Sequence, residues 1–133
     1  MILTWSQRKL MTTFLTVLQV IAALGLLNVW LLRFNRGTKY RGGSASTMLE
    51  EFATYGLPSW FAYAIGALKV GSALALLAGI WFPSLVLPAA ALVGLLMVGA
   101  LAMHTKIGDP LSKSVPALAM LVITLTIGWG SLR

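Results

Sequence analysis

Four long apolar stretches constrain the fold of this chain more than any other feature of its sequence. They cover residues 10–32, 58–80, 83–103 and 115–132 and leave little of the 133 residues outside them. A helix needs about 20 apolar residues to cross the hydrocarbon core of a bilayer. Because 59% of the side chains are hydrophobic and 10% are charged, a water-soluble core does not account for them. We therefore expect residues 1–133 to form a single membrane domain, an all-α, four-transmembrane-helix antiparallel bundle.

The ends of these stretches carry residues typical of a membrane interface. The five tryptophans lie near the expected helix ends, with Trp30 and Trp60 at one face of the membrane and Trp5, Trp81 and Trp129 at the other. The first stretch is longer than the apolar region of a signal peptide and has no small-residue cleavage site, so we expect it to remain in the mature protein. Together these features predict an integral, multi-pass protein of a bacterial inner membrane.

Basic residues favour one orientation of the bundle. Six lie after the first and third stretches and three lie on the opposite side: Arg33, Arg36, Lys39, Arg41, Lys106 and Lys113 against Arg8, Lys9 and Arg133. Since cytoplasmic loops are rich in Lys and Arg, this favours both termini outside, although the basic pair before the first helix favours the reverse. Anionic lipid headgroups explain the net charge of +7. We expect membrane lipids as partners and no nucleic acid.

The segment between the first two stretches is basic over residues 33–43 and amphipathic after that. Thr47 and Glu50 have the spacing of a capping box, and apolar side chains then recur on one side of a helix. This pattern predicts a short interfacial amphipathic helix at about residues 47–55. Glu50 and Glu51 lie on its polar side. The helix is either a membrane-surface anchor or a lid that brings one of these glutamates to a group inside the bundle.

Lys69 is the least expected residue of the chain, because it lies about eleven residues into the second stretch, near the bilayer midplane. Inserting a lysine there costs about 2.5 to 3.5 kcal/mol, so the side chain should face the bundle interior or a wet cavity. Small residues around it permit close helix packing: Gly66 on the lysine's own face, and Gly71, Ala75 and Gly79 on a second stripe. A structural polar contact, ligand or proton handling, and snorkelling to the headgroups all remain open for Lys69.

Several groups are candidates for the partner of Lys69. The spans contain no carboxylate, and the loop acids are Glu50, Glu51 and Asp109. Hydrogen bonds to Gln19, Asn28 or helix carbonyls, or a neutral amine, are the alternatives.

The stretch MHTKIGDPLSKSVP, residues 103–116, contains the one histidine of the chain. Asp109 is placed to cap a short helix that begins at Pro110. His104 either makes a polar contact at headgroup depth or lines a site with Lys69 and the loop acids. The candidate ligand-binding residues are therefore Lys69, His104, Glu50, Glu51 and Asp109. A lone histidine without any cysteine gives no metal site, and we assign no catalytic residue.

Two segments carry a resemblance to a known family. They are EEFATYGLPSWFAYAIGALKVGSALALLAGIWFP and LMVGALAMHTKIGDPLSKSVPALAML, with an acidic-Phe segment before Y-G-L-P, a G-x-L-K core and an M-H-x-K-x-x-D-P loop. Over about residues 48–125 the chain resembles the DoxX-like family of small four-helix integral membrane proteins. The resemblance implies a four-helix bundle. Many similar members have a glutamate in the middle of the second helix, where this chain has Lys69, so no role of that acid is carried over.

The resemblance implies several functions. Named relatives include a membrane subunit of a thiosulfate:quinone oxidoreductase, subunits linked to oxidative-stress complexes and a eukaryotic branch that assists receptor assembly. Because the chain has no cysteine, it has no cofactor of its own, and a borrowed quinone is the candidate. We expect an accessory or anchoring subunit of a larger membrane complex, with a protein partner or a homo-oligomer and no catalysis of its own. The alternatives are a quinone- or lipid-binding component of an oxidoreductase and a small-molecule transporter.

Overall fold

The computed structural model describes residues 2–132, and within them it is all-helical. The α-helices are α1 (Trp5–Leu27), α2 (Met48–Thr54), α3 (Ser59–Ala78), α4 (Val86–Lys106) and α5 (Val115–Ser131). Three short segments accompany them: a π-helix (Asn28–Leu32) and two 3₁₀ turns (Pro83–Leu85 and Leu111–Ser114). Four helical segments are long and apolar enough to cross a membrane. The expected four-span bundle, with a short helix between its first two spans, is confirmed.

Local hydrogen bonds explain where several helices begin and end. α1 starts at Trp5 rather than at residue 10, because Thr4 and Gln7 form a capping box: the Gln7 amide donates to Thr4 Oγ1 at 3.1 Å, and the Thr4 amide donates to Gln7 Oε1 at 2.9 Å. Thr47 caps α2 by accepting from the Glu50 amide at 3.2 Å. After α2 the chain turns at Gly56, whose φ of 85° is a left-handed conformation that glycine adopts without strain.

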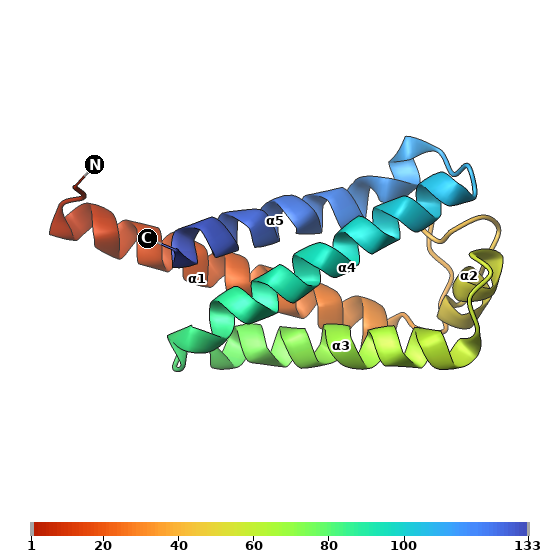
Figure 1. Ribbon diagram of the computed structural model, residues 1–133, viewed down its shortest axis with the longest axis horizontal. Coiled ribbons are helices and arrows are strands. Elements are labelled where there is room, and N and C mark those ends of the chain that lie inside the picture. Colours follow the sequence, from red (N-terminus) through yellow and green to blue (C-terminus); the bar gives the residue numbers. More distant parts are fainter. Residues whose placement is uncertain (1, 133) are drawn as a thin grey trace.

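The four long helices are close together near the termini and diverge toward the other end (Figure 1). In the close half, the core contains the small residues Ala22, Ala23, Ala73, Ala89 and Ala90, around the fully buried side chains of Leu76, Val93 and Ile127. Small side chains let helix backbones approach one another. At the other end the pair α1–α3 separates from the pair α4–α5, and the second core cluster there contains larger residues, Trp30, Met48 and Phe52.

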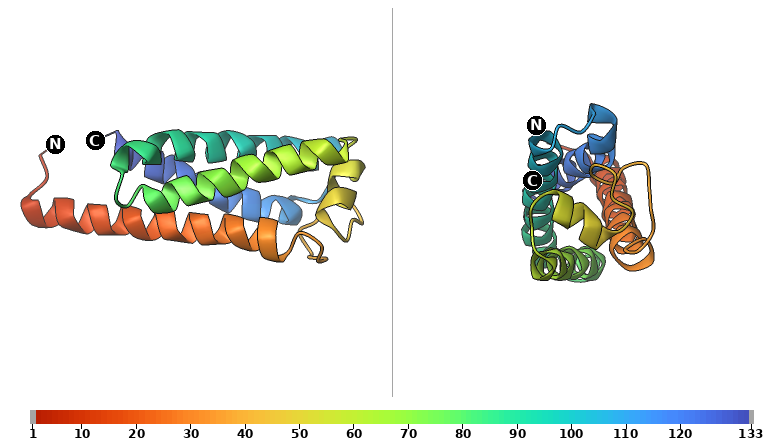
Figure 2. Two further views of the ribbon diagram at one scale, coloured as in Figure 1. Left: turned by 90° about the horizontal axis from the view of Figure 1, so that it is seen from below. Right: turned by 90° about the vertical axis from the view of Figure 1, so that its right-hand side faces the viewer.

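α2 lies across this open end of the bundle (Figure 2). Met48, Phe52 and the following Tyr55 are buried, while Glu50 is exposed, as the amphipathic pattern predicts. Glu51 differs, because the sequence places it on the polar side together with Glu50 but the structure buries it. The reason is a partner inside the end of the bundle, Arg41, which the helical pattern alone does not reveal.

Candidate ligand-binding site

A cavity of about 740 Å³ lies where the helix pairs diverge, and all five α-helices contribute to its lining. Its wall is largely apolar and includes Leu26, Trp30, Phe52, Phe61, Met97 and Met103. Polar side chains reach it from different elements, among them Asn28, Glu51, Tyr55, Lys69 and His104, and further basic and hydroxyl side chains line it from the loops. An apolar cavity of this size with a few convergent polar groups is typical of sites for small molecules.

Lys69 enters this cavity from α3. Its ammonium lies 5.0 Å from the centre of the Trp30 ring, in a cation–π contact. Trp30 reaches that position because Gly66, one turn before Lys69, leaves room for its ring: a Cβ on Gly66 would lie 2.8 Å from Trp30 Cε3. Trp30 belongs to the π-helical segment that ends the first span, a distortion often found at functional sites. The side chain of Lys69 therefore faces the interior rather than the lipid headgroups.

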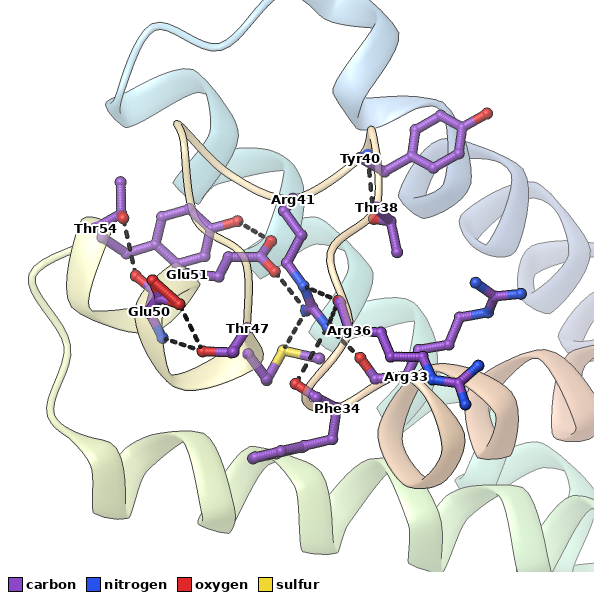
Figure 3. Close-up of polar contacts among 12 residues, drawn as sticks. Arg33, Phe34, Arg36, Thr38, Tyr40, Arg41, Thr47, Glu50, Glu51 and Thr54 are labelled. Carbon is purple, nitrogen blue, oxygen red and sulfur yellow. Dashed lines mark hydrogen bonds and ion pairs between the residues drawn. The ribbon is translucent and has the colours of Figure 1, made fainter.

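Arg41 and Glu51 form a buried ion pair at the α2 end of the cavity, as Figure 3 shows. Arg41 Nη1 lies 2.9 Å from Glu51 Oε2, and the same guanidinium donates to the backbone carbonyls of Arg33, Phe34 and Arg36. One side chain thus satisfies several carbonyls of an irregular segment that would otherwise lack partners. This pairing holds the segment before α2 against the helix itself.

Tyr55 completes this group by donating from its hydroxyl to Glu51 Oε1 at 2.7 Å. Burial raises the pKa of the Tyr55 phenol, and the Glu51 carboxylate raises it further. Tyr55 therefore remains protonated and acts as a donor. Both oxygens of Glu51 are occupied, one by Arg41 and one by Tyr55.

His104 and Asp109 form a second buried pair on the α4 side. His104 Nδ1 lies 2.7 Å from Asp109 Oδ2, and Asp109 Oδ1 accepts from the Gly43 amide at 3.0 Å. Burial raises the pKa of Asp109, but the hydrogen bonds from His104 and Gly43 and the Lys113 ammonium together hold it below its usual value. Because an ionised Asp109 is an acceptor only, Nδ1 carries the proton. His104 Nε2 has no hydrogen-bond partner among residues 2–132 and remains available to a molecule in the cavity.

Asp109 was expected to cap the short helix after Pro110, and this expectation is wrong. The 3₁₀ turn Leu111–Ser114 has no side-chain cap, because the carboxylate of Asp109 turns toward His104 and Gly43 instead. The stretch around His104 is thus more than a connection between two helices.

The structure brings together three of the candidate ligand-binding residues, Glu51, Lys69 and His104, around one cavity. Asp109 lies behind His104 and orients it. Glu50 is exposed and bonds to Thr47, away from the cavity lining. Within residues 2–132 there is no group of three or more His, Cys, Asp or Glu side chains suited to a metal ion. Gln19 lies apart from Lys69, because it donates to the carbonyl of Leu76 at 3.1 Å.

Sequence reasoning named Asn28 only as an alternative partner of Lys69 and missed three further residues of the site: Trp30, Arg41 and Tyr55. Trp30 was expected at the headgroups, yet only 6% of it is exposed, whereas the other four tryptophans are largely exposed. Tyr55 follows Glu51 by one helical turn, a spacing that allows a side-chain hydrogen bond and could have indicated the pair. Nothing in its neighbours distinguishes Arg41 from the other basic residues of its segment.

The predicted packing positions on α3 fall in different surroundings. Gly66 faces Trp30, and Gly79 faces Val86, whose Cγ2 would lie 2.5 Å from an added Cβ. Ala75 is partly buried beside the main core cluster. Gly71 is exposed, and no atom would lie within 4 Å of a Cβ added there. Three of these positions therefore pack within the chain, and Gly71 is open to the surroundings of the bundle.

Comparison with known proteins places this architecture in a family. Residues 37–127 match the model of the DoxX-like family. Uncharacterized protein YdgD of Bacillus subtilis (strain 168) is 31% identical over 84 residues, which cover 62% of this chain and 74% of YdgD. No solved structure gives a significant match. With four apolar helices long enough to span a bilayer, this integral, multi-pass membrane protein belongs to the DoxX-like family.

Proposed function

We propose that this chain binds a small amphipathic molecule, a quinone or a lipid, inside the membrane and acts as a binding subunit beside a protein partner. The observation that carries the proposal is the cavity of about 740 Å³ into which Glu51, Lys69 and His104 converge. Helix bundles often hold their ligands between diverging helices, with a few polar groups to orient them. The apolar wall suits a ring or chain, and the polar groups suit a head.

The polar groups also indicate which role the chain would have with a quinone. The Lys69 ammonium is the group that would donate to a quinone oxygen, and His104 Nε2, an acceptor when Nδ1 carries the proton, would accept from a quinol hydroxyl. The chain has no cysteine and therefore no disulfide relay or thiolate-bound cluster, so in this proposal electrons would come from or go to a partner. Binding and positioning, rather than catalysis, are the roles that these residues support.

A matched pair of cavity variants tests the proposal. Ala100 lines the cavity, whereas Ala91, on the same helix α4, is exposed and lies outside the cavity lining. Ala100→Phe should fill the space, and Ala91→Phe should leave it unchanged. The measurement is native mass spectrometry of protein purified in mild detergent. We expect a bound quinone or lipid in the wild type and in Ala91→Phe, and its loss in Ala100→Phe. No bound molecule in the wild type, or equal occupancy in both variants, would contradict the proposal.

We also propose that the chain is an accessory or anchoring subunit, because α3 offers small residues on its outer face. Ala64, Ala67 and Gly71 are exposed and follow one another at helical spacing, which permits close approach of another helix. The basic segments after α1 and α4 support a bacterial inner membrane with these segments on the cytoplasmic side.

A further inference from the structure

Two of the three acidic side chains of this chain, Glu51 and Asp109, are neutralised by partners within the chain. The sequence contains three acids. Glu51 is held by Arg41 and Tyr55, and Asp109 is held by His104 and the Gly43 amide, with Lys113 Nζ at 3.9 Å. The third acid, Glu50, is exposed at the start of α2. The lining therefore contains no carboxylate that lacks a partner within residues 2–132.

Among the described residues, Lys69 has no such partner, and unlike Arg33 and Lys39, which also lack one, it is not exposed. No carboxylate of residues 2–132 lies within 4.0 Å of its ammonium, which contacts the face of Trp30. Lysine has three N–H donors, and the Trp30 ring attracts the charge without accepting all of them. Asn28 lines the same cavity, and its side-chain amide has no hydrogen-bond partner among residues 2–132. Donors without acceptors thus remain in an otherwise apolar part of the site.

The charged side chains that line the cavity are mostly positive, like Lys69. Five basic side chains line the cavity, Arg33, Lys39, Arg41, Lys69 and Lys113, against the single carboxylate of Glu51. The pair Arg41–Glu51 is neutral as a unit. Arg33 and Lys39 are exposed to solvent, whereas Lys69 is only partly exposed. An unpaired positive charge in a largely apolar cavity favours an anion over a neutral molecule.

We propose that the molecule bound in this cavity is a long-chain carboxylate, whose head pairs with Lys69 and whose chain lies along the aromatic and methionine side chains. This inference rests on the proposed binding function and specifies the class of its ligand. The ammonium of Lys69, partly buried against Trp30, matches a single negative charge. The Asn28 amide supplies a further hydrogen bond to a carboxylate oxygen, and the apolar wall accommodates the hydrocarbon chain.

The test compares an acid with its neutral ester. Protein purified in an uncharged detergent is titrated with cis-parinaric acid and with its methyl ester, and binding is followed by the fluorescence of the polyene. The wild type should bind the acid at least about tenfold more tightly than the ester, because truncating or neutralising one partner of a buried charge pair weakens it by that factor or more.

Variants of Lys69 assign this preference to one side chain. Lys69→Met and Lys69→Gln should bind the acid no more tightly than the ester, with ester affinity unchanged, whereas Lys69→Arg should keep the preference. Lys9→Met removes the same charge from an exposed site on α1, outside the cavity lining, and should behave as the wild type. Thermal unfolding of each variant shows that it is folded, and unchanged ester binding shows that its cavity is intact.

The outcomes separate this inference from the proposed function. Equal affinity of the wild type for acid and ester, or an acid preference that survives in Lys69→Met, overturns the inference that the ligand is a carboxylate. Either result leaves the proposal that the cavity binds an amphipathic molecule in place. Binding of neither probe by the wild type contradicts both proposals. Ala100→Phe should abolish binding of acid and ester alike, whereas a change at Lys69 should affect the acid alone.

Discussion

At the scale of single residues, Asp109 joins two segments that are distant in the sequence. One carboxylate oxygen accepts from His104, at the end of α4, and the other accepts from Gly43, in the segment before α2. Lys113 strengthens the connection by donating to the Gly43 carbonyl. The carboxylate thus fixes the ring of His104 and anchors the segment that carries Arg41. Charge-assisted hydrogen bonds of this kind are stronger than neutral ones.

Low pH should therefore destabilise the fold, because it protonates the Asp109 carboxylate. Its pKa is lowered in the folded state from an ordinary value of 3.8, so its contribution to stability is complete above that value and is lost as the pH falls through the folded pKa. We expect the Tm of the detergent-solubilised wild type to fall more steeply than that of Asp109→Asn below about pH 4. At neutral pH the variant should have the lower Tm. Parallel profiles of Tm against pH would show that this carboxylate does not stabilise the fold.

At the scale of elements, the small residues of α3 serve two different surfaces. Gly79 ends the helix against Val86 of α4, so its missing side chain allows the close connection between these helices. Gly71 has open space in front of it. One glycine therefore belongs to the packing of the chain itself, and the other is free for an external helix.

The same substitution at both glycines should separate these roles. Gly79→Leu should lower the Tm of the isolated protein markedly, because its first side-chain atom already meets Val86. Gly71→Leu should leave that Tm within a few degrees of the wild type and reduce the yield of any co-purifying protein partner. Thermal unfolding and quantitative co-purification of the two variants provide the measurements. A large loss of Tm in Gly71→Leu would mean that this position packs within the chain.

The four long helices were predictable from the sequence because each needs a long apolar stretch, whereas α2 was predicted from its capping-box spacing and amphipathic pattern. The inward position of Lys69 followed equally from the cost of a charge in the bilayer. The orientation of Glu51 and the role of Asp109 were not predictable in this way. Each depends on a partner, Arg41 or Gly43, whose position is set by an irregular segment without periodicity. The size of the cavity depends on the divergence of the helix pairs, which no local pattern encodes.

At the scale of the whole molecule, the connections lie at two opposite ends of the bundle. The segment before α2 and the α4–α5 connection are at one end, and the α3–α4 turn is at the other, near the termini (Figure 1). The natural sequence has no cysteine, so single cysteines can report on each end without interference.

Single-cysteine labelling should reproduce this arrangement in membranes. Ser44, Ser84 and Ser112 are exposed. With an impermeant thiol reagent on intact cells, Ser44→Cys and Ser112→Cys should be accessible from the same side of the membrane, and Ser84→Cys should be accessible from the opposite side. The excess of basic residues predicts that the first two lie in the cytoplasm and are protected until the cells are opened. Labelling of Ser44→Cys and Ser84→Cys from the same side would contradict the four-span topology, whereas external labelling of Ser44→Cys would reverse the orientation alone.

The division of the bundle into a close half and an open half has a consequence for how such a protein can evolve. The alanine-rich core near the termini holds the helices together, and the residues that line the cavity lie mostly beyond it. Substitutions in the cavity lining therefore leave most of that core intact, since distant sites contribute to stability almost independently. If the cavity binds the carboxylate that we propose, a change in the sign of the charge at Lys69 alone would alter which molecules bind. Proteins of this architecture can thus diverge in ligand preference while their scaffold persists.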